Sequence, residues 1–211
     1  MSAFRPKAKV AALLAALLAL GSQSASAVSV RQQNLVDLIG QSEEIMFGTV
    51  RSVSDGFTGE GVPYTEVTVQ VADKIRGQRA ETFTFRQFGL LEPRKINGRT
   101  YLGVTPEGWP TWRRDETVLL FVGKPARLTG LRTTVGLGQG KLRMVDGRLR
   151  NEADNAGLFA RMTVTAPGLS RAQRAMLASN GSPVESAAFI ELVRRAVKEN
   201  WIGKGVMRHA K

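Results

Sequence analysis

The chain of 211 residues contains 30 lysines and arginines, 18 aspartates and glutamates and no cysteine, which gives it a formal net charge of +12 at pH 7. The lack of cysteine excludes a disulfide scaffold, a thiol nucleophile, a cysteine-ligated metal and lipidation at a lipobox cysteine. The positive charge favours anionic partners such as lipid headgroups, acidic polysaccharide or nucleic acid.

The first 27 residues have the pattern of a secretory signal peptide. Three basic residues precede an apolar run from residue 10 to residue 20, and Ala25-Ser26-Ala27 follow. This pattern predicts cleavage after Ala27, and the apolar run is shorter than the roughly 20 residues of a membrane span. We therefore expect an exported protein, periplasmic or extracellular, whose mature chain 28–211 is one domain without a transmembrane segment. For such a protein, envelope polyanions rank above nucleic acid as partners.

The next part of the chain predicts one short helix and four strands. Leu35, Leu38 and Ile39 recur at helical spacing before Gly40, which predicts a docking helix with its end near the glycine. The predicted strands are 44–54, 64–77, 81–89 and 116–124.

Three of these strands carry burial patterns. The odd positions 65–71 alternate with polar residues, which indicates a half-buried strand, and Phe83 and Phe85 point inward in the next one. Residues 118–122 are apolar without alternation, which fits a central strand covered on both faces.

A long segment between residues 87 and 115 has no predicted regular structure, and insertions of this length are usually functional or mobile. It gathers cationic and aromatic side chains: Arg94, Lys95, Arg99, Tyr101, Trp109, Trp112, Arg113 and Arg114. Arginine beside tryptophan suits planar or anionic ligands and is enriched in protein interfaces. The alternative is that Trp109 and Trp112 close the end of a barrel as core residues.

The glycines at 136, 138 and 140, followed by Lys141, raise the question of a phosphate loop. A dinucleotide fingerprint needs glycine at 141, and a phosphate loop needs glycine at 135 and Ser or Thr at 142, where Val135 and Leu142 stand. Both templates fail, so we expect a bulge or tight bend before a strand.

Asp146-Gly147 predicts a two-residue turn, so that residues 141–145 and 148–152 form a hairpin with 145 opposite 148, 144 opposite 149 and 143 opposite 150. One face is then apolar through Leu142, Met144 and Leu149. The cationic face comprises Lys141, Arg143, Arg148 and Arg150. Arg143 opposite Arg150 is a destabilising like-charge pair, which an anionic ligand or an acidic neighbour would relieve. The alternative is a solvated face with Glu152 beside Lys141.

The C-terminal part, 158–202, predicts helices. One helix is expected over 170–181, opened by Ser170, and a second one after Ser182, with Ser182 as N-cap, Pro183 as first helical residue and Glu185 completing a capping box. The apolar stripe of the second helix is Phe189, Leu192, Val193, Ala196 and Val197.

These elements predict an α+β fold: a five- to six-stranded antiparallel OB-like barrel or sheet, barrel residues 44–152, with a short N-terminal helix and C-terminal helices. Within residues 44–145 the chain contains, in order, Gly48-Thr49-Val50, TEVTVQVADKIRG, FTFRQFG and WPTWRRDETVLLFV. This succession resembles exported bacterial domains related to the netrin-like, inhibitor-type OB barrels. The chain departs from that group at Arg114-Asp115, where Gly-Asp or Gly-Glu is usual, and it lacks the disulfides of the eukaryotic members. The resemblance implies the fold and leaves the function open.

Enzyme chemistry has little support in the sequence. The only histidine, His209, lies in the C-terminal tail, which we expect to be mobile. The carboxylates Glu43-Glu44 and Asp115-Glu116 are expected to be solvated starts of strands. No catalytic residue, metal site or cofactor is predicted.

The leading interpretation is an exported, non-enzymatic, basic domain that binds an anionic ligand or another exported protein. The expected binding residues are Arg94, Arg99, Tyr101, Trp109, Trp112, Arg113, Arg114, Arg143, Arg148 and Arg150. Two alternatives remain: an inhibitor or accessory subunit of an exported protease, which the netrin-like resemblance implies, and a hydrolase that uses a pair of carboxylates. The inhibitor family uses an N-terminal cysteine, whereas the expected mature chain here begins with Val28.

Overall fold

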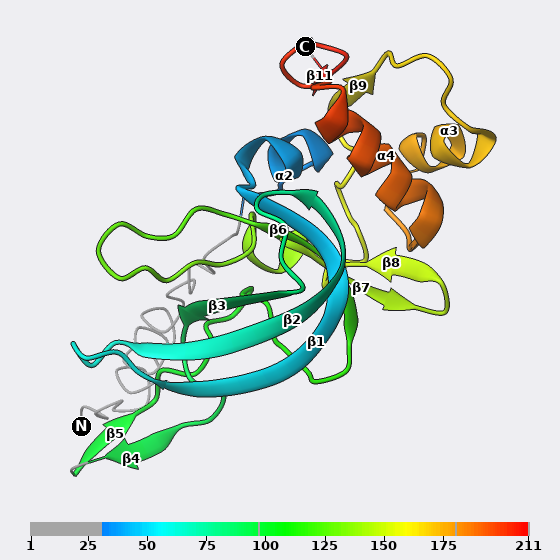
Figure 1. The fold of residues 1–211 in the computed structure, drawn as a ribbon. Coiled ribbons are helices and arrows are strands. Elements are labelled where there is room, and N and C mark those ends of the chain that lie inside the picture. Colours follow the sequence, from blue (N-terminus) through cyan, green and yellow to red (C-terminus); the bar gives the residue numbers. More distant parts are fainter. Residues whose placement is uncertain (1–30, 97, 180, 211) are drawn as a thin grey trace, which may run out of the picture.

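The computed structural model describes residues 31–96, 98–179 and 181–210, so the expected signal peptide lies outside the described residues. The fold is α+β, as predicted: in the described residues a main antiparallel sheet is joined by three α-helices gathered at one end (Figure 1). None of the helices in the described ranges is long and apolar enough to span a membrane.

The main sheet has seven strands in the order β10-β8-β7-β6-β1-β2-β3, one or two more than predicted. Its strands are β1 (Glu44–Phe57), β2 (Pro63–Arg76), β3 (Thr82–Phe88), β6 (Thr117–Val122), β7 (Lys141–Val145), β8 (Arg148–Arg150) and β10 (Val184–Glu185). The sheet is strongly curved along β1 and β2 but is not closed into a barrel (Figure 1). The segment after β6 lies between β6 and the edge strand β3 and contributes single contacts to each: the amide of Arg132 donates to the carbonyl of Arg86 at 2.8 Å, and Thr134 bridges to Val122.

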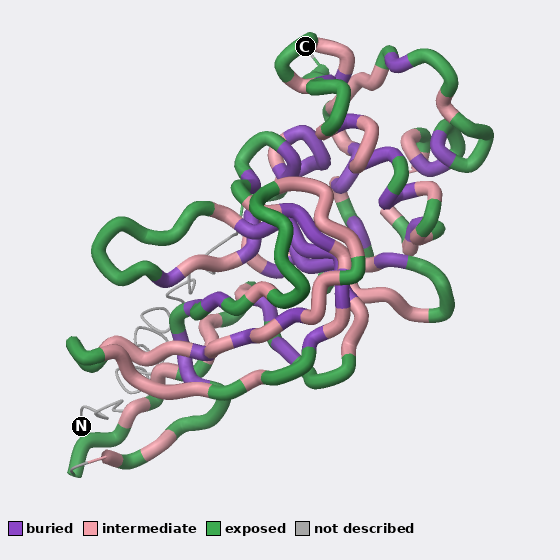
Figure 2. Tube along the Cα trace, viewed as in Figure 1, coloured by how far each residue is buried: buried purple, intermediate pink, exposed green. Residues whose placement is uncertain are grey.

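Strand β6 lies at the centre of the sheet and separates two hydrophobic cores. Leu119 and Phe121 belong to the core under the helices, whereas Val118, Leu120 and Val122 belong to the core inside the curve of β1–β3. All five side chains are buried, which confirms the prediction of a strand covered on both faces. Figure 2 shows buried residues concentrated along this part of the sheet.

The N-terminal helix α2 (Leu35–Gln41) packs its apolar side chains into the core under the helices, as predicted. Asn34 caps its first turn by accepting hydrogen bonds from Val36 N at 3.0 Å and Asp37 N at 3.2 Å. At the other end, the guanidinium of Arg76 on β2 donates to the carbonyls of Ile39 and Ser42. The helix continues through Gly40 to Gln41, and two of its last carbonyls have side-chain donors: Arg76 donates to Ile39 O, and the Ser42 hydroxyl donates to Leu38 O at 2.5 Å.

The C-terminal helices are α3 (Arg171–Leu177), capped by Ser170 as predicted, and α4 (Ser186–Lys198). The predicted capping box at Ser182 is wrong. Val184 and Glu185 instead form β10, which pairs with β8, so the chain remains extended for these two residues. Glu185 is the N-cap, and its carboxylate accepts from the amides of Ala187 and Ala188 at 2.9 and 2.7 Å.

Two small sheets lie outside the main one, and both correct the sequence prediction. The segment expected to lack regular structure contains the hairpin β4 (Arg94–Ile96) and β5 (Arg99–Tyr101). The tail expected to be mobile forms β11 (Met207–His209), which pairs with β9 (Met162–Val164). His209 Nε2 lies 3.4 Å from Asp37 Oδ1, so the tail contacts helix α2.

Candidate functional site

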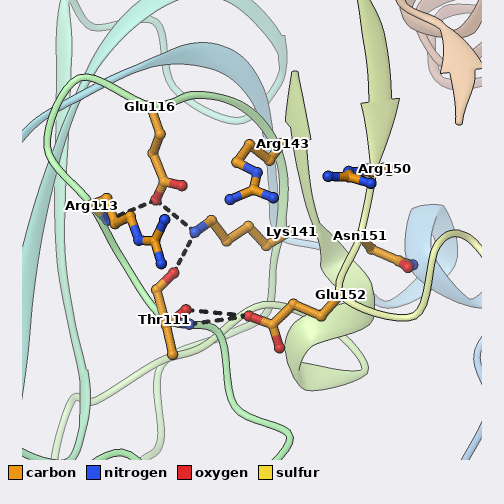
Figure 3. A pocket seen from close by; sticks show the side chains of 8 residues that line it. All are labelled: Thr111, Arg113, Glu116, Lys141, Arg143, Arg150, Asn151 and Glu152. Carbon is orange, nitrogen blue, oxygen red and sulfur yellow. Dashed lines mark hydrogen bonds and ion pairs between the residues drawn. The ribbon is translucent and has the colours of Figure 1, made fainter. Parts of the chain in front are cut away.

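A pocket of about 290 Å³ opens beside the start of β7. We call it the cationic pocket; it is lined by Thr111, Arg113, Glu116, Lys141, Arg143, Arg150, Asn151 and Glu152 (Figure 3). Four of these side chains are basic and two are acidic. The pocket joins the hairpin face predicted from the sequence to the last residues of the long segment before β6.

The hairpin β7–β8 places two arginines side by side. The register is the predicted one: Arg143 opposite Arg150, Met144 opposite Leu149 and Val145 opposite Arg148. Asp146 and Gly147 both have positive φ, 50° and 73°, as a two-residue type I′ turn requires. Because opposite residues in such a pair lie close together, the two guanidinium groups share one side of the pocket.

A buried ion pair forms the floor of the pocket. Lys141 Nζ lies 2.6 Å from Glu116 Oε1, and both side chains are only 7% exposed. The ammonium also donates to the carbonyl of Thr111 and lies 4.6 Å from the ring centroid of Trp112. Burial lowers the pKa of Lys141 despite the opposing effect of Glu116. Lys141 is therefore not part of a solvated face.

Two predictions of solvated carboxylates are wrong for the same reason. Glu116 is buried against Lys141, and its carboxylate also accepts from the amide of Arg113 at 2.9 Å. Glu44 lies 2.5 Å from Lys74, and both of these side chains are mostly buried. In each case a lysine on a neighbouring strand removes the carboxylate from solvent, whereas Asp115 and Glu43 stay exposed.

The glycine run lies directly before Lys141 and close to Glu152, two of the residues that line the pocket. Residues Leu137–Gly140 form a single turn of 3-10 helix rather than a phosphate loop, and β7 begins at Lys141. A Cβ at Gly140 would clash with the carbonyl of Val135, and one at Gly138 would lie 2.8 Å from Glu152 Oε2. Glycine at these two positions therefore allows the turn to pack closely and Glu152 to approach it.

The guanidinium groups of Arg113 and Arg143 lie on either side of the Lys141 ammonium in Figure 3. Within the described ranges, neither forms an ion pair or a side-chain hydrogen bond. Arg150 is 3.5 Å from Asp154, an exposed residue of the following turn. Since Glu116 is occupied by Lys141, the arginines leave the pocket with an excess of positive charge.

Glu152 and Asn151 have structural partners. Glu152 Oε1 accepts from the amide and the hydroxyl of Thr111, both at 3.4 Å. Asn151 points away from the arginines, and its side-chain oxygen accepts from the amides of Ala153 and Asn155. The bonds of Glu152 hold the chain after β8 against the segment before β6, whereas those of Asn151 shape the turn that follows it.

The expected binding residues do not form one site. Of the ten, only Arg113, Arg143 and Arg150 line the cationic pocket. Arg148 is on the hairpin but donates to the carbonyl of Pro183 at 3.1 Å, and Arg114 is exposed beside Asp115. The remaining five, Arg94, Arg99, Tyr101, Trp109 and Trp112, lie elsewhere.

Trp112 is a core residue, which decides between the two alternatives for this side chain. It is buried, its ring packs edge-on against Phe85 at 5.4 Å, and its indole Nε1 donates to Gln87 at 2.9 Å. Trp109 is only partly buried and lies near the ring of Phe88, at 6.2 Å.

The other three residues belong to the β4–β5 hairpin. Arg94 forms an ion pair with Asp55 at 2.5 Å, and Tyr101 packs against Phe57 with ring centroids 4.7 Å apart. Arg99 is exposed. These contacts fasten the hairpin to the end of β1, so Arg94 and Tyr101 have structural roles.

Sequence reasoning missed Thr111, Glu116, Asn151 and Glu152 as pocket residues. The sequence offered one signal for these residues, which is Lys141 at the start of a predicted strand. A lysine that is buried in a sheet needs a carboxylate partner, so its position could have pointed to a nearby glutamate. In the part of the chain that the structure describes, no group of three or more His, Asp or Glu residues could hold a metal ion. Comparisons of the chain with protein-family models, with curated proteins and with solved structures found no match, so the function is inferred from the site itself.

Proposed function

We propose that this protein is an exported, non-enzymatic binding domain that holds an anionic ligand between Arg113, Arg143 and Arg150. The observation that carries the proposal is the cross-strand pair of Arg143 and Arg150 at a pocket with excess positive charge. Two like charges opposite each other destabilise a sheet. An anion between them removes that cost, and a ligand that binds only the folded protein stabilises it further.

The size and chemistry of the pocket suit one compact anionic group. Guanidinium groups bind phosphate and carboxylate through paired hydrogen bonds. A volume of about 290 Å³ lies at the small end for ligand pockets. The ligand is therefore a headgroup, or one charged unit of a longer envelope polymer, rather than a large planar molecule.

The hydrolase alternative has one observation in its favour, because Glu116 and Glu152 line the same pocket. Acid and base catalysis requires carboxylates that can exchange protons with a substrate. Here Glu116 accepts from Lys141 and from the amide of Arg113, and Glu152 accepts from Thr111. These bonds support a structural role for both. Turnover of a phosphate ester or glycoside by the mature protein, lost in E152Q, would favour the hydrolase instead.

The test is binding of the mature chain to heparin, anionic vesicles and an oligonucleotide across a salt series. R143Q/R150Q removes two pocket cations, and R171Q/R208Q removes the same charge from exposed positions elsewhere. A hydrogen bond to a charged group contributes about 1.5–3 kcal/mol, so R143Q/R150Q is expected to weaken binding at least tenfold while the control stays close to wild type.

The salt series identifies how the ligand is held, because contacts with polyanions weaken as salt rises. If the wild type binds none of the three probes at low ionic strength, the proposal fails. It also fails if the two double variants lose the same affinity, because general positive charge would then explain the binding.

A further inference from the structure

Three neighbouring loops form one end of the molecule, which we call the loop end. They are the turn 58–62 between β1 and β2, the described residues 89–96 and 98–104 with the β4–β5 hairpin, and the loop 123–131 after β6. In Figure 1 all three project toward the left of the view, and Figure 2 shows exposed residues along each of them.

The three loops are linked to one another through a shared hollow and through the end of β1. Thr58 lines a hollow together with Pro125 and Gly130, which joins the first loop to the third. The stacking of Phe57 with Tyr101 and the ion pair of Asp55 with Arg94 join the β4–β5 hairpin to the end of β1.

All the exposed large apolar side chains of the described residues belong to the loop end or to the strand residue next to it. They are Phe88, Leu91, Leu102, Val104 and Leu128. Leu128 is 90% exposed and Leu102 is 72% exposed. Single exposed apolar residues are common on protein surfaces, whereas apolar residues gathered in one region are a feature of interaction sites.

Cations accompany these apolar side chains. Lys95, Arg99, Lys124 and Arg127 are exposed, and none of them has an ion-pair partner within the described ranges. The acidic residues of the three loops are Glu60 and Glu92. The third loop, which carries Leu128, has two cations and no acid.

We propose that the loop end docks on the surface of an anionic lipid bilayer, with Leu102 and Leu128 inserted at the level of the headgroups. Protein interfaces have an apolar centre from which charged residues are depleted. Here each of the two leucines projects from a separate loop, and cations stand close to it in the sequence, as Arg127 does to Leu128. Apolar side chains with neighbouring cations suit an anionic bilayer, which takes up the first and attracts the second.

The contact is distinct from the cationic pocket, since the two sets of residues do not overlap. Binding is measured by co-sedimentation with vesicles of phosphatidylcholine alone and of phosphatidylcholine with phosphatidylglycerol. The variants are L102S/L128S, K124Q/R127Q, R143Q/R150Q and the control R171Q/R208Q. The leucines and lysine-arginine pair are exposed, so these substitutions leave the cores intact, which thermal unfolding checks.

The wild type is expected to bind only the anionic vesicles. Each inserted leucine is expected to raise the affinity for the vesicles about tenfold, and each cation near the membrane surface about fivefold. L102S/L128S and K124Q/R127Q are therefore both expected to lose most of the binding. The control retains it. Trp109 lines a pocket together with Val62 and Lys124 of the loop end, so its fluorescence is expected to be quenched by brominated lipid in the wild type but not in L102S/L128S.

Three results would overturn the proposal. The first is a wild type that does not co-sediment with anionic vesicles. The second is L102S/L128S that binds as well as the wild type. The third is loss of binding in R143Q/R150Q alone, which would place the lipid headgroup in the cationic pocket; it would support the proposed function and refute docking through the loops. Conversely, loss in the loop variants together with R143Q/R150Q that binds heparin normally would refute the proposed function alone.

Discussion

Lys141 and Glu116 form a mostly buried ion pair at the floor of the cationic pocket, with 2.6 Å between Nζ and Oε1. The lysine begins β7 and the glutamate immediately precedes β6, so the pair joins two strands of the central sheet. Its ammonium is enclosed by Thr111 and Trp112 as well. The pair thus fixes the floor over which the arginines are arranged.

Breaking this pair is expected to destabilise the fold strongly. K141M leaves the carboxylate of Glu116 buried without its cation, and the loss of one partner from a buried pair costs about 3–5 kcal/mol in the free energy of unfolding. Urea unfolding of the wild type and K141M measures this loss in the free energy of unfolding. D115N changes the neighbouring, exposed carboxylate and is expected to shift stability by less than about 0.5 kcal/mol. Equal effects of the two variants would mean that Glu116 and Lys141 are not buried together.

The stability of the wild type relative to K141M is expected to rise with pH in the alkaline range. Burial lowers the pKa of Lys141 in the folded state below its ordinary value of 10.5. Between the lowered value and 10.5 the unfolded state binds more protons, so increasing pH favours the folded state. K141M lacks this titrating group, so subtracting its pH profile removes the contribution of the other titratable groups to the stability. A difference that falls as pH rises toward 10.5 would contradict the direction of this shift.

R150Q is expected to increase the stability of the ligand-free protein by about 0.2–1 kcal/mol, because it removes the like charge opposite Arg143. The exposed contact with Asp154 is lost as well, but such pairs contribute little. R148Q, on the same strand but opposite Val145, is expected to give no gain. A gain that disappears at high salt identifies its origin as electrostatic. R150Q less stable than R148Q would contradict the repulsion.

The two neighbouring tryptophans are expected to respond differently to truncation. W112A removes a buried ring and leaves Gln87 without its indole partner, so it should cost about 3–5 kcal/mol. W109A removes a partly exposed ring and is expected to cost clearly less. Chemical denaturation of both variants measures the difference, and similar losses would contradict the assignment of Trp112 alone to the core.

The sequence was sufficient where a local pattern determines structure. Asp146-Gly147 predicted the hairpin register residue by residue, and the unbroken apolar run 118–122 predicted the central strand. The sequence was insufficient where distant segments meet. Pairing of Glu116 with Lys141 depends on how β6 and β7 align, and burial of Trp112 depends on Gln87 of β3. The capping motif at Ser182 failed because pairing of Val184 with Leu149 overrides the local preference. The netrin-like resemblance stays a prediction.

Binding of an anion by Arg113, Arg143 and Arg150 can be followed through the arginine side-chain Nε–Hε signals of a ¹⁵N-labelled mature protein. During titration with inorganic phosphate, these three signals are expected to show saturable shifts, and those of Arg171 and Arg208 are expected to show no such change. Shifts that are equal for all exposed arginines, or that leave the three pocket signals unmoved, would contradict it.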